Sequence, residues 1–356
     1  MVNLKNLKKF WKNKKIFITG HTGFKGAWLC IFMNLLGAKV YGYSLPPKKK
    51  SLFNQANCKK FLKENIYANI LNYNFLKNKI IKTKPDIIFH LAAQPLVSKS
   101  FENPLETFNT NIIGTTNILN LVKDQKSIKS VVIITTDKVY EIKRNNKSYD
   151  EEDALGGKDP YSSSKVCTEI IMNSYNESFY KNNFLRNRIS TARSGNVIGG
   201  GDYSENRLVP DIIEAINKNK NLIVRNPNNI RPWQHVIEPL LGYMKLAELQ
   251  FKNKKIDIKR PAWNFGPNKN SFVKVIEIVN YIKKKVKLKS RIQKKQSFFE
   301  TKILKLNSNK AKKYLKWSPV WNLTKSIDSV IEWNKLYKKT KNAKQICENQ
   351  IIKYLK

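Results

Sequence analysis

Residues 16–26 read IFITGHTGFKG, and this stretch decides the fold. The apolar run Ile16–Thr19 predicts a buried strand, and three glycines follow it at the spacing GxxGxxG. From Ala27 to Leu36 the apolar residues form a helical stripe, which stops at Gly37. Strand, glycine turn and helix therefore follow one another in the order that a dinucleotide-binding site requires.

Each glycine of this turn has its own expected task. Gly20 permits the tight turn, Gly23 lets the backbone approach a pyrophosphate, and Gly26 lets the helix pack closely on the strand. The phosphates would then lie on the amino end of the helix. A second strand is expected at 39–43, but Ser44 and not an acidic residue follows it, so this position leaves NAD and NADP both open.

Further apolar runs alternate with helical segments along the chain. They lie at 66–69, 86–91, 128–135 and 189–193, and 261–267 reads as a seventh strand. The alternation predicts an α/β fold with a Rossmann-type, doubly wound parallel sheet of about seven strands. We expect a dinucleotide-binding domain at 1–194, with 236–266 returning to it. A smaller C-terminal substrate-binding lobe is expected at 195–235 and 267–356.

The expected strand at 128–135 ends abruptly in hydroxyl and charged side chains. Thr136, Asp137 and Lys138 stand there, at the edge of an open α/β sheet where ligands bind. Tyr161 and Lys165 lie four residues apart at the start of an expected helix, so they share one face. A cationic lysine beside a tyrosine favours the phenolate, which can take a proton near neutral pH. Taken alone, this pair favours an ordinary surface helix, but the glycine turn favours catalysis.

Other polar side chains follow the remaining strands. Ala92, Ala93 and Gln94 would let a flat cofactor lie close to the end of the strand at 86–91. Asn111 is expected on a neighbouring helix, and Asn69 is equally a neighbour of the adenine or a turn residue. The arginines of the second half, where a diphosphate could be clamped, are Arg193, Arg207, Arg225 and Arg231. Each alone favours a solvated charge, but together they favour binding by Arg207 and Arg231.

The chain is strongly basic. Its 356 residues include 67 Lys and Arg against 26 Asp and Glu, a formal net charge of +41. Such a charge could indicate nucleic-acid binding, but the lysines are spread along the whole chain. A general compositional bias explains them better, so no nucleic-acid partner is expected. The positive field would still attract an anionic small substrate.

Cysteines and histidines show no metal-binding spacing, so no metal is expected. They are Cys30, Cys58, Cys167 and Cys347, and His21, His90 and His235. The cysteines read as reduced thiols of a cytoplasmic protein. No apolar run of about 18 residues predicts a membrane span, and the basic start of the chain lacks a signal-peptide core. We therefore expect a cytoplasmic location.

Seven segments together resemble nucleotide-sugar dehydratases of the extended short-chain dehydrogenase/reductases. They are GHTGFKGAW (20–28), HLAAQPLVSKS (90–100), TTDKVYE (135–141), LGGKDPYSSSK (155–165), ARSGNVIGGGD (192–202), RLVPDI (207–212) and IRPWQHVIEPL (230–240). The resemblance runs from about residue 10 to about residue 333. The glycine spacing and the Tyr–Lys pair mark only the superfamily, whereas Asp137-Lys138, in place of an Asp-Glu pair, is the pattern of the CDP-glucose branch.

The resemblance implies three sets of site residues. The catalytic set is Thr136, Asp137, Lys138, Tyr161 and Lys165. The NAD-binding set is Gly20, His21, Thr22, Gly23, Phe24, Lys25, Gly26, Ser44, Asn69, Leu91, Ala92, Ala93, Gln94, Asn111, Thr135, Tyr161 and Lys165. The substrate-binding set is Gln94, Lys99, Arg193, Asn196, Arg207, Arg231 and His235.

The implied reaction is NAD-dependent dehydration of CDP-glucose to CDP-4-dehydro-6-deoxyglucose, with internal hydride transfer from sugar carbon 4 to carbon 6. Tyr161, held by Lys165, would take the proton of the 4-hydroxyl, and Asp137 would protonate the departing 6-hydroxyl. Lys138 would act as the base at carbon 5 if it is neutral, or would otherwise orient the sugar or stabilise the enolate. The product would feed the synthesis of deoxysugars and surface polysaccharides.

Two alternatives remain open at this stage. Another nucleotide-sugar short-chain enzyme, such as a dTDP- or GDP-sugar dehydratase or a 4-epimerase, would share the glycines, Tyr161 and Lys165, but an epimerase has no use for Asp137-Lys138. A basic nucleic-acid-binding protein is the alternative of another class. The resemblance also implies a homodimer, formed by the helices that start near Asn103 and Pro160. Their apolar residues include Ile112, Ile118, Leu119, Ile170 and Ile171.

Overall fold

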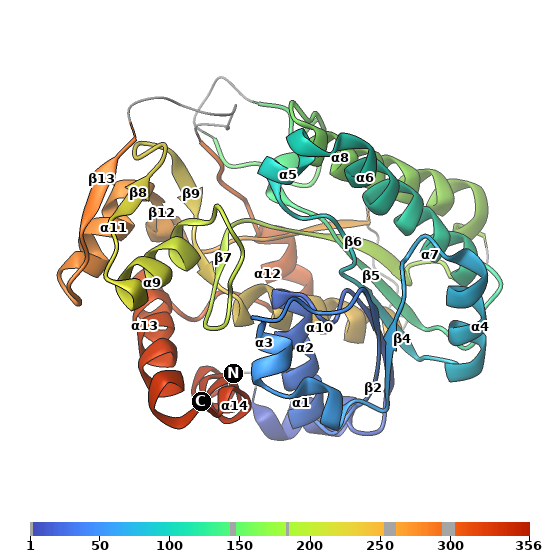
Figure 1. Cartoon of the computed structure of the whole chain (residues 1–356). Helices are drawn as coiled ribbons and strands as arrows, with labels where there is room; N and C mark the ends of the chain where they lie inside the picture. Colours follow the sequence, from blue (N-terminus) through green and yellow to red (C-terminus); the bar gives the residue numbers. More distant parts are fainter. Residues whose placement is uncertain (1–2, 143–146, 183–184, 253–260, 294–302) are drawn as a thin grey trace.

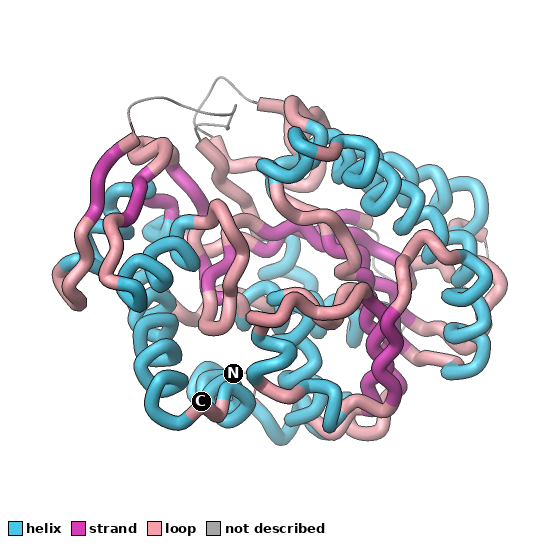
Figure 2. The backbone as a smooth tube through the Cα atoms, in the orientation of Figure 1, coloured by secondary structure: helices cyan, strands magenta, loops and turns pink. Residues whose placement is uncertain are grey.

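A computed structural model describes residues 3–142, 147–182, 185–252, 261–293 and 303–356. Its centre is a parallel sheet of seven strands with the order β11-β6-β5-β4-β1-β2-β3 (Figures 1 and 2). The strands are β1 (Lys15–Thr19), β2 (Lys39–Ser44), β3 (Glu64–Tyr67), β4 (Ile87–His90), β5 (Ser130–Ile134), β6 (Ile189–Ser194) and β11 (Ala262–Phe265). The order runs outward in both directions from β1 and β4, which confirms the predicted Rossmann-type sheet.

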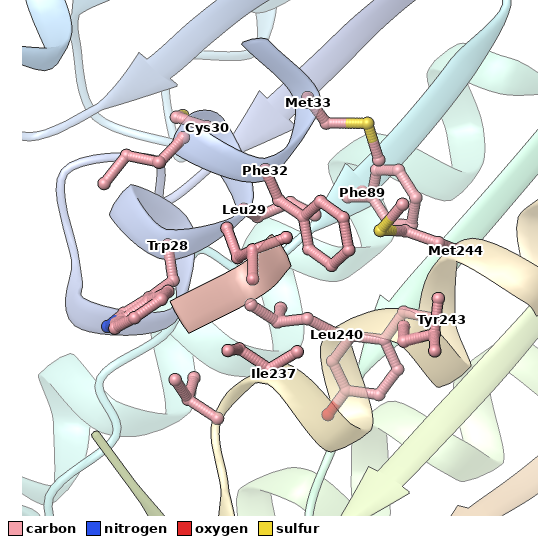
Figure 3. Close-up of a cluster of buried hydrophobic side chains, with 14 of the residues drawn as sticks. Trp28, Leu29, Cys30, Phe32, Met33, Phe89, Ile237, Leu240, Tyr243 and Met244 are labelled. Carbon is pink, nitrogen blue, oxygen red and sulfur yellow. The ribbon is translucent and has the colours of Figure 1, made fainter. Parts of the chain in front are cut away.

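One face of the sheet is covered by α2 (Phe24–Leu35) and α10 (Ile237–Phe251). Every residue of α2 from Gly26 to Met33 is buried, because α10 and the C-terminal helix α14 (Ala343–Tyr354) also pack against it. A helix with buried residues on all sides needs such neighbours, and this explains why its apolar run is nearly continuous. Figure 3 shows where Phe32 of α2 and Leu240 of α10 lie in this core.

The other face is covered by α4 (Tyr73–Thr83), α7 (Gly114–Val122) and α8 (Pro160–Tyr175) (Figure 1). Both central strands β4 and β5 are buried at every position, as expected for parallel strands with helices on both faces. Short helical segments join these elements. They are α3 (Leu52–Gln55), η1 (Cys58–Phe61), α5 (Val97–Glu102), α6 (Pro104–Phe108), η2 (Asn109–Ile113), η3 (Asp137–Val139) and η4 (Asn176–Tyr180).

A smaller lobe with its own core lies beside the carboxyl edge of the sheet, on the left in Figure 1. Its helices are α9 (Leu208–Lys218), α11 (Val275–Lys283) and α13 (Leu323–Thr340). Its strands pair as β7 (Val197–Ile198) with β10 (Gln234–His235), β8 (Leu222–Val224) with β13 (Ser290–Ile292), and β9 (Ile230–Pro232) with β12 (Phe272–Lys274), which η5 (Lys269–Ser271) precedes. The lobe provides a second wall above the sheet edge.

The chain passes between the two parts more than once. After β10 it returns to the sheet through α10 and β11, which pairs with β6. The C-terminal segment is shared, because α12 (Asn309–Leu315) packs on β11 and α14 packs on α2. The N-terminal helix α1 (Leu4–Trp11) joins the same core, where Phe10 contacts Phe251 of α10. A boundary at residue 194 stays a proposal.

The described segments also bear on membrane spans, metal ligands and thiols. None of their helices is long and apolar enough to span a membrane. In the same segments, no three His, Cys, Asp or Glu side chains gather as metal ligands. The thiols of Cys30, Cys58 and Cys347 are buried, that of Cys167 is partly exposed, and all four are free.

Candidate active site

The turn after β1 is shaped by close contact with the end of β4. Gly20 has a positive φ of +72°, and a Cβ there would lie 2.6 Å from the backbone nitrogen of Ala92. A Cβ at Gly26 would lie 2.2 Å from the carbonyl oxygen of Gly20. Gly23 begins α2 without any side-chain cap, so the N–H groups of the first turn remain for an anion. The structure therefore places the glycines as a dinucleotide pyrophosphate requires.

The loop after β4 is held by a buried amide. Asn111 Oδ1 accepts a hydrogen bond from the Gln94 backbone N–H (2.8 Å), and its Nδ2 donates to Ser164 Oγ on α8 (2.8 Å). Asn111 lies in η2, a π-helical turn of the kind often found at functional sites. The Gln94 side chain turns back on its own loop, where it bonds with Leu96 and Thr107. Asn111 and Gln94 thus shape the loop and do not line the cavity described next.

A cavity of about 270 Å³ lies between the carboxyl edge of the sheet and the small lobe. Ligands of open α/β sheets bind at this edge. Residues of all three predicted sets line it: Lys25, Thr135, Thr136, Asp137, Lys138, Tyr161, Asn196, Arg207 and Arg231. The cavity joins groups from α2, α8, α9 and the ends of β5 and β6, and its lining residues lie as far apart in the sequence as Lys25 and Val275.

Asp137 is the most constrained acid of this cavity. Its side chain is 2% exposed, Oδ1 accepts a hydrogen bond from Thr136 Oγ1 (3.1 Å), and Oδ2 accepts none from any described residue. Burial raises the pKa of the carboxyl, against the opposing effects of Lys138 and Arg231. A Cβ at Gly195 would lie 3.0 Å from Oδ2, so this glycine leaves space beside the buried oxygen. A buried acid with an unused oxygen is suited to donate or accept a proton.

Tyr161 lies in the first turn of α8, which Pro160 begins and Asp159 caps by accepting from the Ser162 N–H (2.9 Å). Burial raises the pKa of Tyr161 to about 12, while a hydrogen bond with Thr136 and the charge of Arg207 lower it. That Lys165 favours the phenolate stays a prediction. Its Nζ donates to the Ile134 carbonyl (3.2 Å), and burial lowers its pKa to about 8.

Lys25 reaches the cavity from α2. Its Nζ donates a hydrogen bond to Ser194 Oγ (2.8 Å), which also accepts from the Tyr243 hydroxyl (2.8 Å). Burial lowers the pKa of Lys25 to about 7, Arg207 lowers it further, and Asp137 raises it. The resemblance assigned Lys25 to the cofactor, and in the structure Lys25 lines the same cavity as the predicted catalytic residues Asp137 and Tyr161.

Two predicted substrate residues lie elsewhere. Arg193 is 2% exposed and forms a two-pronged ion pair with Glu169 (both N–O distances 2.9 Å), and it also donates to the Tyr140 hydroxyl (2.8 Å). Its N–H groups therefore bond with Glu169 of α8 and with Tyr140, and not with a ligand. His235 is fully buried between Trp28 and Trp321, where desolvation lowers its pKa to about 3. Both corrections have one cause, because each side chain points into the protein and not into the cavity.

Lys99, Asn69 and His21 do not line the cavity either. Lys99 is exposed on α5 and does not line the cavity. Asn69 Oδ1 accepts from the Leu71 N–H (3.0 Å), so its side chain closes a turn. His21 is buried against Gly42 and bonds with Asn65 Oδ1 (2.7 Å), whereas Thr22 and Ser44 join their hydroxyls (2.8 Å) beside the end of β2.

The comparisons with known proteins point to one family. The family model described as GDP-mannose 4,6 dehydratase matches residues 17–330. The chain belongs to the GDP-mannose 4,6 dehydratase family. It is 40% identical over 340 residues to the CDP-glucose 4,6-dehydratase of Salmonella typhimurium, covering 93% of each chain. It is 27% identical over 332 residues to the UDP-glucose 4-epimerase of Mycoplasma genitalium, covering 88% of this chain and 94% of that protein.

Solved structures show the same fold. The dTDP-glucose 4,6-dehydratase of Bacillus anthracis, in complex with NAD, superimposes with a TM-score of 0.75 at 23% identity over 92% of this chain and 97% of that chain. The UDP-glucuronic acid 4-epimerase of Bacillus cereus, in complex with UDP-glucuronic acid and NAD, gives 0.77 at 21% identity over 90% and 99%. The resemblance to nucleotide-sugar dehydratases that the sequence motifs indicated is thus confirmed at the level of the family.

Several residues of this family member's cavity were missing from the predicted sets. They are Ser194, Gly195, Asp202, Asn206 and Asp211. Ser194 and Gly195 follow β6 directly, so their place at a strand end was a usable signal. Asp202 and Asp211 gave no such signal. They form ion pairs with Arg207 (3.6 Å) and Arg225 (2.7 Å), and only the folded lobe brings these partners together.

Proposed function

We propose that this chain is an NAD-dependent hydro-lyase that converts CDP-glucose to CDP-4-dehydro-6-deoxyglucose. The observation that carries the proposal is that Asp137, Lys138 and Tyr161 line one cavity. Dehydration needs a group that takes the 4-hydroxyl proton and an acid for the 6-hydroxyl, whereas a 4-epimerase has no use for the acid. The 40% identity to a CDP-glucose 4,6-dehydratase over 93% of the chain supports the choice of reaction and nucleotide.

The glycine turn fits NAD. Gly20 and Gly26 stand where a Cβ would collide with backbone, and the uncapped first turn of α2 would hold the pyrophosphate. Thr135 and Tyr161, two further residues of the predicted NAD-binding set, line the cavity. When bound, NAD would supply the oxidation of sugar carbon 4 and the later reduction of carbon 6.

The residues of the chain would handle the protons. Tyr161 would accept the proton of the 4-hydroxyl, helped by the Thr136 hydroxyl and by Arg207, which both lower its pKa. Tyr161 must lose its own proton before it can accept this one, and burial, which raises its pKa to about 12, opposes that loss. Asp137, whose pKa burial raises, would hold a proton for the departing 6-hydroxyl. Lys138, at the same wall, would serve carbon 5 as a base or by stabilising the enolate.

The proposal extends to assembly and setting. α5, α6 and α8 pack on one another and leave large apolar side chains exposed, Leu105 at 70% and Ile170 at 56%. We propose that this face forms a homodimer. Ile118 and Leu119 were expected there too, but they are fully buried in the core below the sheet. The family resemblance further suggests a cytoplasmic enzyme that supplies deoxysugars for surface polysaccharides such as lipopolysaccharide O-antigen.

The test is direct incubation of the purified protein with NAD and CDP-glucose, followed by mass spectrometry. We expect loss of one water from the sugar nucleotide, and a higher kcat/KM for CDP-glucose than for dTDP- or UDP-glucose. Tyr161→Phe should bind CDP-glucose normally but turn over about 10²–10⁴ times more slowly. Formation of CDP-galactose without loss of water would identify an epimerase. Equal kcat/KM values for all three nucleotides would limit the assignment to a nucleotide-sugar dehydratase.

A further inference from the structure

The cavity has a catalytic end and a second end. Arg207 and Arg231 line the cavity together with Tyr161 and Asp137, and Gly195 lies close both to Asp137 Oδ2 and to Pro232, which follows Arg231. Arg225 lines the same cavity from the end of β8, where it pairs with Asp211 of α9. A nucleotide sugar is built in the order sugar, diphosphate, ribose and base. With the sugar at Tyr161 and the diphosphate at the two nearer arginines, the base reaches Arg225.

Arg225 forms a paired group with an acid at this second end. Its Nη2 donates to Asp211 Oδ2 (2.7 Å) in the first turn of α9, and its Nη1 donates to Asn206 Oδ1 (2.6 Å). The side chains of Arg225 and Asp211 are 33% and 28% exposed, so a ligand can reach them. Within the described ranges, Arg225 Nε and Asp211 Oδ1 make no hydrogen bond. The pair therefore keeps a donor and an acceptor for a ligand.

This arrangement matches one pyrimidine better than the others. The pairing edge of cytosine carries two acceptors, O2 and N3, next to the N4 amino donor. The unused donor of Arg225 can meet the N3 acceptor, and the unused carboxylate oxygen of Asp211 can meet the N4 amino group, so these two positions are complementary. Uracil and thymine carry an N3–H donor and an O4 acceptor instead. They would set a donor against the guanidinium and an oxygen against the carboxylate.

We propose that the Asp211–Arg225 pair is the base-selecting element of the site and that it selects cytosine over uracil and thymine. The proposal rests on the proposed function for the direction in which the nucleotide lies. Rejection is the stronger part of the selection, because a wrong base sets donor against donor and acceptor against acceptor and leaves these polar groups without partners in the complex. A good two-point contact of this kind discriminates by about tenfold or more against the wrong base.

The test measures binding of CDP and UDP by calorimetry, without any chemistry. The two ligands share the ribose and the diphosphate and differ only in the base. Asp211→Asn replaces the acceptor by a group that can also donate to uracil O4. Arg225→Lys keeps the positive charge but loses the planar pair of donors. Glu214→Gln is the matched control, because Glu214 lies one turn along α9 in an exposed pair with Lys218 and does not line the cavity.

We expect the wild type and Glu214→Gln to bind CDP about tenfold more tightly than UDP, and Asp211→Asn and Arg225→Lys to bring this ratio to about threefold or less. Melting temperatures near that of the wild type would show that both variants are folded. An unchanged ratio in both folded variants would overturn the proposal, as would equal weakening of CDP and UDP, which would make Arg225 a phosphate ligand. Because binding needs no turnover, a failure of dehydration alone would count against the proposed function and leave this ratio to be judged separately.

Discussion

At the scale of single residues, Asp137 is the side chain on which the proposed dehydration depends. Its carboxyl is buried, its pKa is raised, and one oxygen faces Gly195 without a partner among the described residues. Burial of an ionised acid is costly unless it is paired, so burial raises the pKa of this carboxyl. A raised pKa makes an acid better suited to protonate a leaving hydroxyl.

We predict that Asp137→Asn separates the two halves of the reaction. The amide has nearly the same shape but is a very poor acid, so product formation should fall by about 10²–10⁴-fold while CDP-glucose binding changes little. Oxidation at carbon 4 would persist, because Tyr161 is untouched. In deuterated water, recovered CDP-glucose should therefore gain deuterium at carbon 5, which mass spectrometry detects. Full product formation by this variant would show that Asp137 is not the acid.

Arg193 illustrates the opposite case, a buried charge with a structural task. Its ion pair with Glu169 is almost completely shielded from solvent, with side-chain exposures of 2% and 3%. The paired guanidinium lowers the pKa of Glu169 against the effect of burial. Glu169 also accepts hydrogen bonds from Thr135 and Thr191 (2.6 Å each) and so ties α8 to the ends of β5 and β6.

We predict that Arg193→Met lowers the free energy of unfolding by about 3–5 kcal/mol, because it leaves a buried carboxylate unpaired. Arg207→Met is the matched comparison, since Arg207 is 35% exposed and lines the cavity. That variant should keep a melting temperature close to the wild type and raise the KM for CDP-glucose. Thermal unfolding and steady-state kinetics of both variants check this. A raised KM with normal stability in Arg193→Met would restore its predicted role in substrate binding.

At the scale of elements, one buried acid joins the start of α10 to the C-terminal helix. Glu238 is fully buried and accepts hydrogen bonds from the Trp321 N–H (2.7 Å), the Val320 N–H (3.0 Å) and the Tyr354 hydroxyl. Burial raises the pKa of Glu238 to about 7. Trp321 in turn packs against His235. The acid thus helps to hold α14 and the 320–321 segment against the rest of the core.

We predict a pH-dependent stability from this contact. The folded pKa of about 7 exceeds the ordinary 4.5, so the contribution of Glu238 is complete below about pH 4.5 and is lost as the pH rises through 7. Relative to the wild type, Glu238→Gln should therefore gain up to about 3 kcal/mol of unfolding free energy between pH 5 and pH 8. Denaturant unfolding at both pH values measures this.

Glu248→Gln is the control for this prediction, because Glu248 lies on the same helix in an i,i+4 pair with Lys252. Its stability relative to the wild type should change little with pH. A difference between Glu238→Gln and the wild type that stays constant from pH 5 to pH 8 would contradict a raised pKa at Glu238.

At the scale of the whole molecule, the exposed apolar side chains are unevenly placed. Helices α5, α6 and α8 lie together at the top of Figure 1. Among them they carry Phe101, Leu105 and Ile170, which are 40%, 70% and 56% exposed. Neighbouring apolar side chains of this size often mark an interface. In a chain with a net charge of +41, a dimer must also overcome repulsion, which favours a large apolar contact.

We predict that the wild type is a dimer by light scattering at micromolar concentration and that Ile170→Asp is a monomer. A buried carboxylate on each side of the contact would cost far more than the interface gains from one isoleucine. Ile292→Asp is the control, because Ile292 is equally exposed at 56% but lies on β13 in the small lobe. A monomeric wild type would contradict the dimer itself. Loss of the dimer in the control alone would place the interface elsewhere.

Local sequence patterns were enough to predict the sheet and the edge at which ligands bind. The glycine turn, the apolar strands and the Tyr161–Lys165 spacing are local patterns, and strand burial and helical periodicity follow directly from them. The residues at the carboxyl ends of β1 and β5 could therefore be assigned to one site, because parallel strands bring these ends to the same edge. Asp137, Lys138 and Tyr161 do line one cavity.

Only the tertiary structure decided which way the polar side chains point and what they meet. Arg193 and Arg225 are alike in sequence terms, yet one pairs with Glu169 in the core and the other with Asp211 at the cavity. Ile118 and Ile170 are likewise similar, but one is buried and the other exposed. The physical reason is that the environment of a charge or an apolar group depends on segments distant in the chain, whose packing local patterns do not specify.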